Sequence, residues 1–82
     1  MNDDTYDAFR ARMLAESIRD EAGRDVTWRR DSDRYLLIED GHRLANADSL
    51  GEVADMLAAH LEVLRTQLEL DRWIDDVLGD VA

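Results

Sequence analysis

The chain has few side chains that could act as a nucleophile, a base or a metal ligand. It contains no cysteine and only two histidines, His42 and His60, which lie in separate segments. Neither histidine belongs to an HxxxH or HExxH motif, the spacings that gather zinc ligands on one helix face. We therefore expect no metal site and no cofactor.

The remaining hydroxyl and carboxyl groups have simpler explanations than catalysis. Ser17 and Ser32 have no nearby base, and Ser49 is explained as a helix cap. The carboxylates of Asp31 and Asp33 suit a turn, because aspartate side chains accept hydrogen bonds from nearby backbone amides. The four glycines are isolated, which excludes a glycine-rich phosphate loop. We expect no catalytic residue, and the sequence predicts that the protein is not an enzyme.

Arginines in the middle of the chain form the candidate contact surface for an anion or a partner. Arg29, Arg34 and Arg43 are predicted to share one face of a sheet, where guanidinium groups can hold phosphate or carboxylate through two hydrogen bonds. The competing interpretation is that they pair with carboxylates of the same chain. We favour pairing, and we expect no direct binding to nucleic acid because the whole chain would repel phosphate.

The charge of the chain is strongly negative and unusual in its composition. Twenty acidic side chains against ten basic ones give a net charge of −10, and every basic residue is arginine. Aspartate outnumbers glutamate by 14 to 6. A GC-rich genome favours arginine over lysine, but the excess of aspartate favours adaptation to high salt, where screening weakens self-repulsion. The composition resembles that of proteins from halophilic archaea.

The length of the chain predicts one small domain, residues 1–82. Such a chain buries only about 60–65% of the surface that it exposes when unfolded, so oligomerisation would add stability. No apolar run approaches the roughly 20 residues that span a bilayer. Because the N-terminus is acidic where a signal peptide is basic, we expect a cytoplasmic protein without a membrane partner.

Residues 49–78 are predicted to form a single long helix that organises the rest of the chain. Ser49 and Glu52 form a capping box, in which the serine oxygen accepts the Glu52 amide and the carboxylate returns to the Ser49 amide. Gly79 offers a left-handed residue to end the helix. An apolar stripe faces the core and consists of Leu50, Val53, Leu57, Leu61, Leu64 and Leu68.

This long helix also has a second apolar stripe, on another face. Met56, Val63, Leu70 and Val77 recur at heptad spacing, and Trp73, Ile74 and Val81 join the same stripe toward the end of the helix. A continuous helix of this length runs about 43 Å, whereas a domain of 82 residues is only about 30 Å across. We therefore expect the helix to project beyond its own core.

A first helix is predicted over residues 4–22, ended by Gly23. It too has two apolar faces. The small-residue face allows close approach to another helix and consists of Ala11, Leu14, Ala15, Ile18 and Ala22. The other face is limited to the N-terminal half, with Tyr6, Phe9 and Met13.

Residues 26–46 are predicted to form a three-stranded antiparallel β-meander. Asp40-Gly41 is the dipeptide of a type I′ hairpin, which would place Leu37 opposite Leu44 and Ile38 opposite Arg43. One face of the sheet should pack on the helices, and it consists of Val26, Trp28, Tyr35, Leu37 and Leu44. The fold class is α+β, a two-layer domain with an N-terminal helix, the meander and a long C-terminal helix.

The two apolar faces of each helix favour a homodimer that works as a small interaction or regulatory module. Its expected partners are a second copy of the chain and, in addition, another protein. The predicted dimer interface consists of Leu70, Trp73, Ile74 and Val77 with Tyr6, Phe9 and Met13.

Two other functions compete with this one. Carboxylates along the long helix could imitate DNA phosphates and inhibit a nucleic-acid-binding enzyme, as in small viral or phage inhibitors; they are Asp55, Glu62, Glu69, Asp76 and Asp80. Arg65 and Arg72 interrupt this row. A third class is a dimeric DNA-binding protein that uses the meander. Mimicry predicts carboxylates concentrated on one face, whereas salt adaptation predicts them everywhere.

Overall fold

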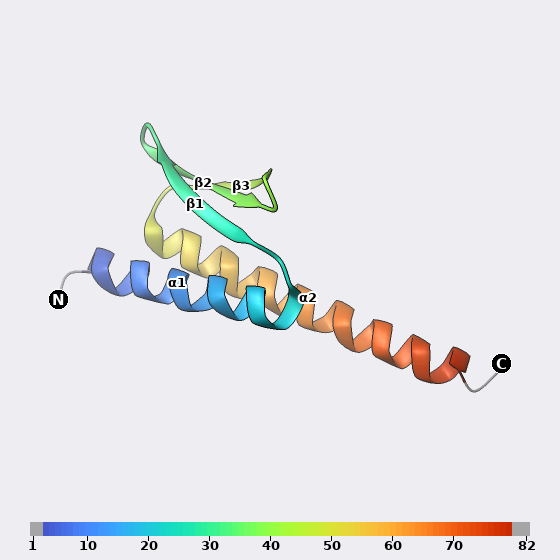
Figure 1. Cartoon of the computed structure of the whole chain (residues 1–82). Coiled ribbons are helices and arrows are strands. Elements are labelled where there is room, and N and C mark those ends of the chain that lie inside the picture. The colour runs from blue at the N-terminus through green and yellow to red at the C-terminus, as the bar shows by residue number, and fades with distance from the viewer. Residues whose placement is uncertain (1–2, 80–82) are drawn as a thin grey trace.

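The computed structural model of the chain describes residues 3–79, which form two helices and one three-stranded sheet. Figure 1 shows their arrangement. The observed order confirms the predicted α+β class. The elements are α1 (Asp3–Ala22), β1 (Val26–Asp31), β2 (Arg34–Glu39), β3 (His42–Ala47) and α2 (Leu50–Gly79). Asp80 and Val81, which the sequence analysis placed on α2, lie outside the described residues.

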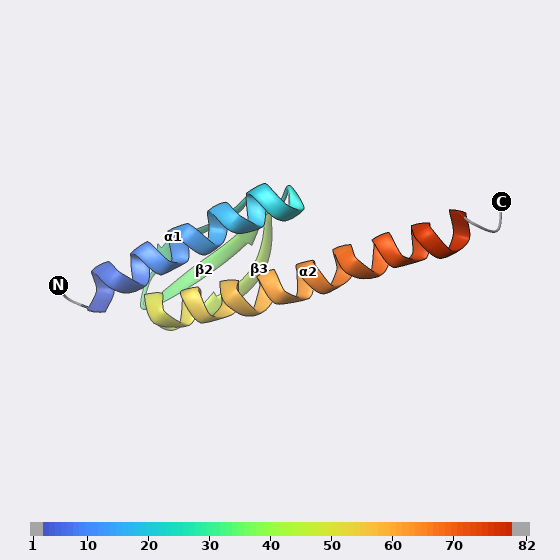
Figure 2. The same cartoon turned by 90° about the horizontal axis from the view of Figure 1, so that it is seen from below.

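The two helices form one layer and the sheet forms the other (Figures 1 and 2). The strands are antiparallel in the order β1-β2-β3. The helices lie side by side and run in the same direction, as two ion pairs between them show: Arg10 contacts Asp55 at 3.2 Å, and Glu21 contacts Arg65 at 2.8 Å. The later residue of α1 contacts the later residue of α2, so the two helices are parallel.

The core lies between the helix pair and one face of the sheet. Most of its members come from the predicted core stripe of each helix and from the predicted inner sheet face, whereas Ala47 and Ala54 were not predicted. The buried residues are Ala11, Ile18, Val26, Leu37, Ala47, Val53, Ala54, Leu57, Leu61 and Leu64. Leu68 was predicted to continue this stripe but is 43% exposed. The reason is that α1 ends at Ala22, so no further turn of α1 covers Leu68, which borders a groove with Glu21 and Arg65.

The hairpin at Asp40-Gly41 has positive φ angles at both residues, +51° and +84°, as a type I′ turn requires. Ile38 lies opposite Arg43, as predicted, and Trp28 lies opposite Leu37. The pairing of Leu37 with Leu44 was wrong, because Leu37 lies opposite Ala45. A β-bulge inserts one extra residue at this point of β3, and bulges cannot be inferred from turn length.

The ends of the helices differ in part from the predicted caps. At the start of α2 the Glu52 amide donates to Ser49 Oγ at 3.1 Å, as expected, but the Glu52 carboxylate accepts the amide of Asp48 rather than that of Ser49. Gly23 ends α1 with a φ of +67°. Gly79 has no left-handed φ and is still helical, so the predicted left-handed end of α2 is wrong within the described residues.

Helix α2 is continuous and projects from the body of the protein (Figure 2), which confirms the expected projection. Its 30 residues give the molecule a long axis of 54 Å, against 27 and 16 Å in the other directions. Every residue from 66 to 79 is exposed. We call this segment the arm.

Candidate functional site

The arm bears large apolar side chains that the rest of the described chain leaves uncovered. Trp73 is 63% exposed and Leu70 is 54% exposed, and Ile74 and Val77 are each more than 40% exposed. These are the four residues of the predicted dimer interface that lie on α2. Contiguous exposed apolar surface of this kind is typical of a protein contact.

This apolar surface continues from the arm onto the body along one side of α2. The heptad positions of the arm, Leu70 and Val77, are preceded at the same spacing by Val63 and Met56. Val63 is 53% exposed although it lies beside the core. We call the whole stripe the seam, which consists of Met56, Ala59, Val63, Leu70, Trp73, Ile74 and Val77.

Where the seam crosses the body, it borders an open groove between α2 and β3, with a volume of about 330 Å³. Leu44, the extra residue of the bulge, lines this groove together with Ala59 and Val63. The other lining residues are Leu37, Ala45, Met56 and His60. Apart from His60, the lining residues are apolar.

His60 lies at the edge of this groove, where its ring contacts the Glu39 carboxylate. Both side chains are largely buried, and Arg24 reaches the same carboxylate at 3.4 Å. The pair ties the middle of α2 to the last residue of β2. Sequence reasoning missed this contact because the two residues are 21 positions apart in different elements.

A second polar contact marks the point where the arm begins. The Arg65 guanidinium donates from Nε and Nη2 to the two carboxylate oxygens of Glu21, at 2.8 and 2.9 Å. These hydrogen bonds hold the pKa of the Glu21 carboxyl below its usual value. Because Glu21 is in the last turn of α1, this is the last ion pair between the two helices among the described residues.

The remaining residues of the predicted interface lie elsewhere. Tyr6, Phe9 and Met13 are exposed, but α1 and α2 run in the same direction, so these residues are near the start of α2 (Figure 1). The arm is at the opposite end of the molecule. The structure therefore does not bring the two halves of the predicted interface together within one chain.

The three arginines of the candidate contact surface do lie on one face of the sheet. The strand register places Arg29 opposite Leu36, and Arg34 and Arg43 lie on the same side of the sheet, away from the helices. Arg34 contacts Asp48 at 3.7 Å. Among the described residues, Arg29 and Arg43 make no ion pair, so the predicted pairing of these arginines with carboxylates is only partial.

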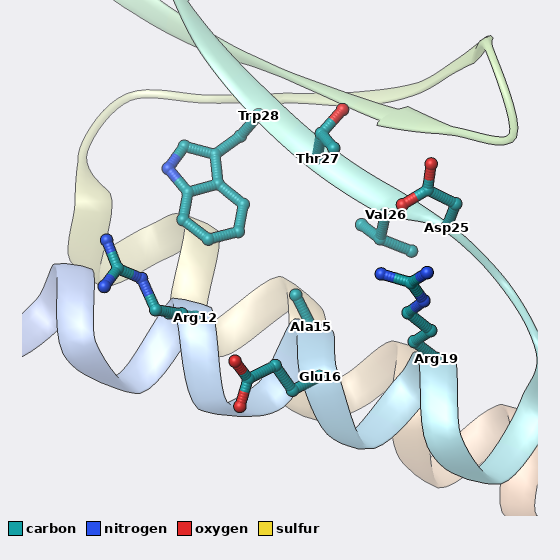
Figure 3. Close-up of a pocket in the computed structure, with 8 residues that line it drawn as sticks. All are labelled: Arg12, Ala15, Glu16, Arg19, Asp25, Val26, Thr27 and Trp28. Atoms are coloured by element: carbon teal, nitrogen blue, oxygen red, sulfur yellow. The ribbon is translucent and has the colours of Figure 1, made fainter.

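Another groove, between α1 and the free edge of β1, has mixed polarity. Figure 3 shows the Trp28 ring between the two elements, with Arg12 and Glu16 on α1 below it and Arg19 beside Val26. The lining combines cations and carboxylates around one indole and includes no histidine, cysteine or serine. Its one hydroxyl group belongs to Thr27, and no histidine lines the groove to act as a base beside it.

The described residues contain neither a candidate metal site nor a helix that could span a membrane. Within residues 3–79 there is no group of three or more His, Asp or Glu side chains placed to hold a metal ion. In the same range no helix combines the length and apolar character needed to cross a membrane.

No protein family, curated protein or solved structure matches the chain.

Proposed function

We propose that the protein is a non-enzymatic interaction module that works as a homodimer in a salt-rich cytoplasm, with the seam of α2 as its dimer interface. The single observation that carries this proposal is the apolar seam on a helix that extends beyond its own core. A second copy supplies the same stripe, and a two-fold axis lets each copy cover the other.

The stability of the arm supports the same proposal. Helices in proteins gain most of their stability from packing of an apolar face. The arm continues α2 without a break, yet each of its residues, 66 to 79, is exposed. Burial of Trp73 and Ile74 against a partner would stabilise it, and Trp73 is of the residue type that most often dominates binding energy.

Mimicry of DNA is the competing proposal, and two contacts weaken it. In the acidic row of α2, Asp55 contacts Arg10 at 3.2 Å, and Glu62 lies 3.9 Å from Arg65. Arginine partners neutralise the charges that a phosphate mimic would present. The arginine face of the sheet remains available in the dimer as the contact surface for a further protein partner.

Sedimentation velocity of the wild type and of Trp73→Asp tests the proposal. We expect the wild type to sediment at twice its chain mass of 9.4 kDa in about 2 M KCl, where charge repulsion is screened. We expect Trp73→Asp to be monomeric. Its far-UV circular dichroism spectrum should still contain the full signal of the helices and strands in residues 3–65.

The matched control is Phe9→Asp. Phe9 is 62% exposed and Trp73 is 63% exposed, so both substitutions replace an equally exposed aromatic ring with a carboxylate. Phe9 lies outside the seam, and this variant should remain dimeric. A monomeric wild type at micromolar concentration would refute the proposed function.

A further inference from the structure

The geometry points to an antiparallel dimer in which the arm of each copy occupies the groove between α2 and β3 of the other copy. This inference rests on the proposed function and specifies the arrangement of the two chains. It makes the groove a binding site whose ligand is a segment of the same protein, the end of the partner subunit's arm at residues 74–79.

The spacing of the seam residues sets the register. Antiparallel helices pack with the three-residue step of one seam against the four-residue step of the other. If the two-fold axis passes near Leu68, Val63 lies beside Ile74 of the partner subunit, and Ala59 lies beside Val77 of the partner subunit. In this register about 20 residues overlap, roughly 30 Å of helix.

The shape of the body excludes a parallel pair. Packed helices approach to about 8–10 Å between their axes. Strand β3 flanks the seam at the level of Met56 to Val63, as the lining of the groove shows. In a parallel pair the two sheets would meet at this level and would keep the helices apart. In an antiparallel pair each sheet meets only an arm, which is a single helix.

The groove also favours this long overlap over contact between the tips of the arms. A tip-to-tip dimer would bury Leu70 to Val77 but would leave Val63, which is 53% exposed, and Leu44, which is 39% exposed, without a cover. The bulge of β3 directs Leu44 to the groove. The partner's Val77 and the partner's Ile74 provide the apolar side chains that would fill it.

The acidic row of α2 lies on one flank of this seam, and the antiparallel register brings like charges together. Glu69 would lie near the two-fold axis beside Glu69 of the partner subunit, and Glu62 would lie near Asp76 of the partner subunit. Like charges at this spacing repel and are screened by salt. The dimer should therefore tighten as salt rises, whereas a dimer with complementary charges would weaken.

Disulfide mapping tests the arrangement, because the chain has no cysteine of its own. Val63→Cys and Ile74→Cys are mixed at about 2 M KCl, allowed to exchange and oxidised, and the cross-links are identified by mass spectrometry. We expect the cross-link between residues 63 and 74, because adjacent seam positions have the Cα separation that a disulfide needs. Both sites are exposed in one chain, so neither variant disturbs the core.

The other cross-links have separate meanings. Links of 63 to 63 with 74 to 74 would show a parallel pair, and links of 74 to 74 alone would show contact between arm tips. Either result in a dimeric wild type overturns the antiparallel inference and leaves the proposed function intact. A monomeric wild type overturns both.

A second variant examines the groove without changing the arm. Ala59 is exposed and small, so Ala59→Arg adds a long cation to the groove and leaves residues 66–79 intact. We expect at least a tenfold higher dissociation constant with unchanged thermal unfolding of the monomer. A dimer of unaltered affinity would show that the groove is empty and would overturn the inference.

Discussion

Arg65 holds Glu21 through two hydrogen bonds, at 2.8 and 2.9 Å, at the last level where α1 lies beside α2. These two hydrogen bonds join the C-terminal end of α1 to the middle of α2. Beyond it, every described residue of α2 is exposed. The contact thus separates the packed part of α2 from the arm.

This pair predicts a specific loss of stability in acid. Arg65 lowers the pKa of Glu21 from 4.5 in the folded chain, so the stabilising contribution is complete above pH 4.5 and is lost as pH falls through the folded value. Glu21→Gln should therefore flatten the acid side of the stability curve below pH 4.5. Urea unfolding at pH 7 and at pH 3.5 measures this. A wild-type slope retained by the variant would contradict it.

The contact between His60 and Glu39 should be energetically coupled. Both side chains are largely buried; removal of Glu39 leaves the His60 ring without this hydrogen bond, whereas removal of His60 leaves Glu39 with Arg24 alone. A double-mutant cycle with Glu39→Gln and His60→Gln should give a coupling of about 1 kcal/mol at pH 7. His42→Gln is the control: His42 lies opposite Glu39 on β3 but is exposed, and its change should stay within about 0.5 kcal/mol.

Two leucines of α2 should separate folding from association. Leu57 is fully buried, so Leu57→Ala should lower the free energy of unfolding by about 2–5 kcal/mol. Leu70 is exposed in one chain, so Leu70→Ala should change the stability of the monomer by less than about 0.5 kcal/mol. The same variant should weaken the dimer. Chemical unfolding at low protein concentration, together with sedimentation, distinguishes the two effects.

Salt should stabilise the folded chain itself. A net charge of −10 on 82 residues opposes compaction, and added ions screen this repulsion. We expect a higher melting temperature in about 2 M KCl than in about 0.1 M KCl. A sulfate salt at equal ionic strength separates screening from the general effect of salts on apolar burial. A melting temperature that does not change with KCl would contradict adaptation to high salt.

The arginine face should not bind duplex DNA. Three arginines on an otherwise acidic protein give too little positive charge to offset phosphate repulsion by the helices. A titration at about 50 mM salt, where phosphate contacts are strongest, should show no saturation. Saturable binding that Arg29→Ala with Arg34→Ala abolishes would instead establish a DNA-binding function.

The sequence predicts the order of elements and the projection of α2, because hydrophobic periodicity and caps are local signals. Ala11 and Ile18 on α1, and Val53 and Leu57 on α2, are buried as their spacing predicts. It does not predict the bulge beside Leu37, because a bulge depends on how β3 meets α2 as well as on the turn. Leu68 was misplaced for a similar reason, since its burial depends on where α1 ends.

The candidate site could be predicted only in part. Trp73 and Ile74 were found from periodicity alone, because the core stripe becomes polar where the second stripe continues. The groove and the contact between His60 and Glu39 could not be found this way, since they join elements that are distant in the sequence. Tyr6 was grouped with the arm because the parallel direction of the two helices has no local signal.

The parallel direction of α1 and α2 has a consequence for how the chain folds. Contacts between the helices join residues at a nearly constant sequence separation, 45 for Arg10 with Asp55 and 44 for Glu21 with Arg65. The helix pair therefore cannot zip up from a turn, as an antiparallel pair can, and every contact closes an equally long loop. We expect the meander, whose pairings are local, to form first and to bring the helices together. Folding should then be slower than in helical proteins of this size, because rates fall as contacting residues become more distant in sequence.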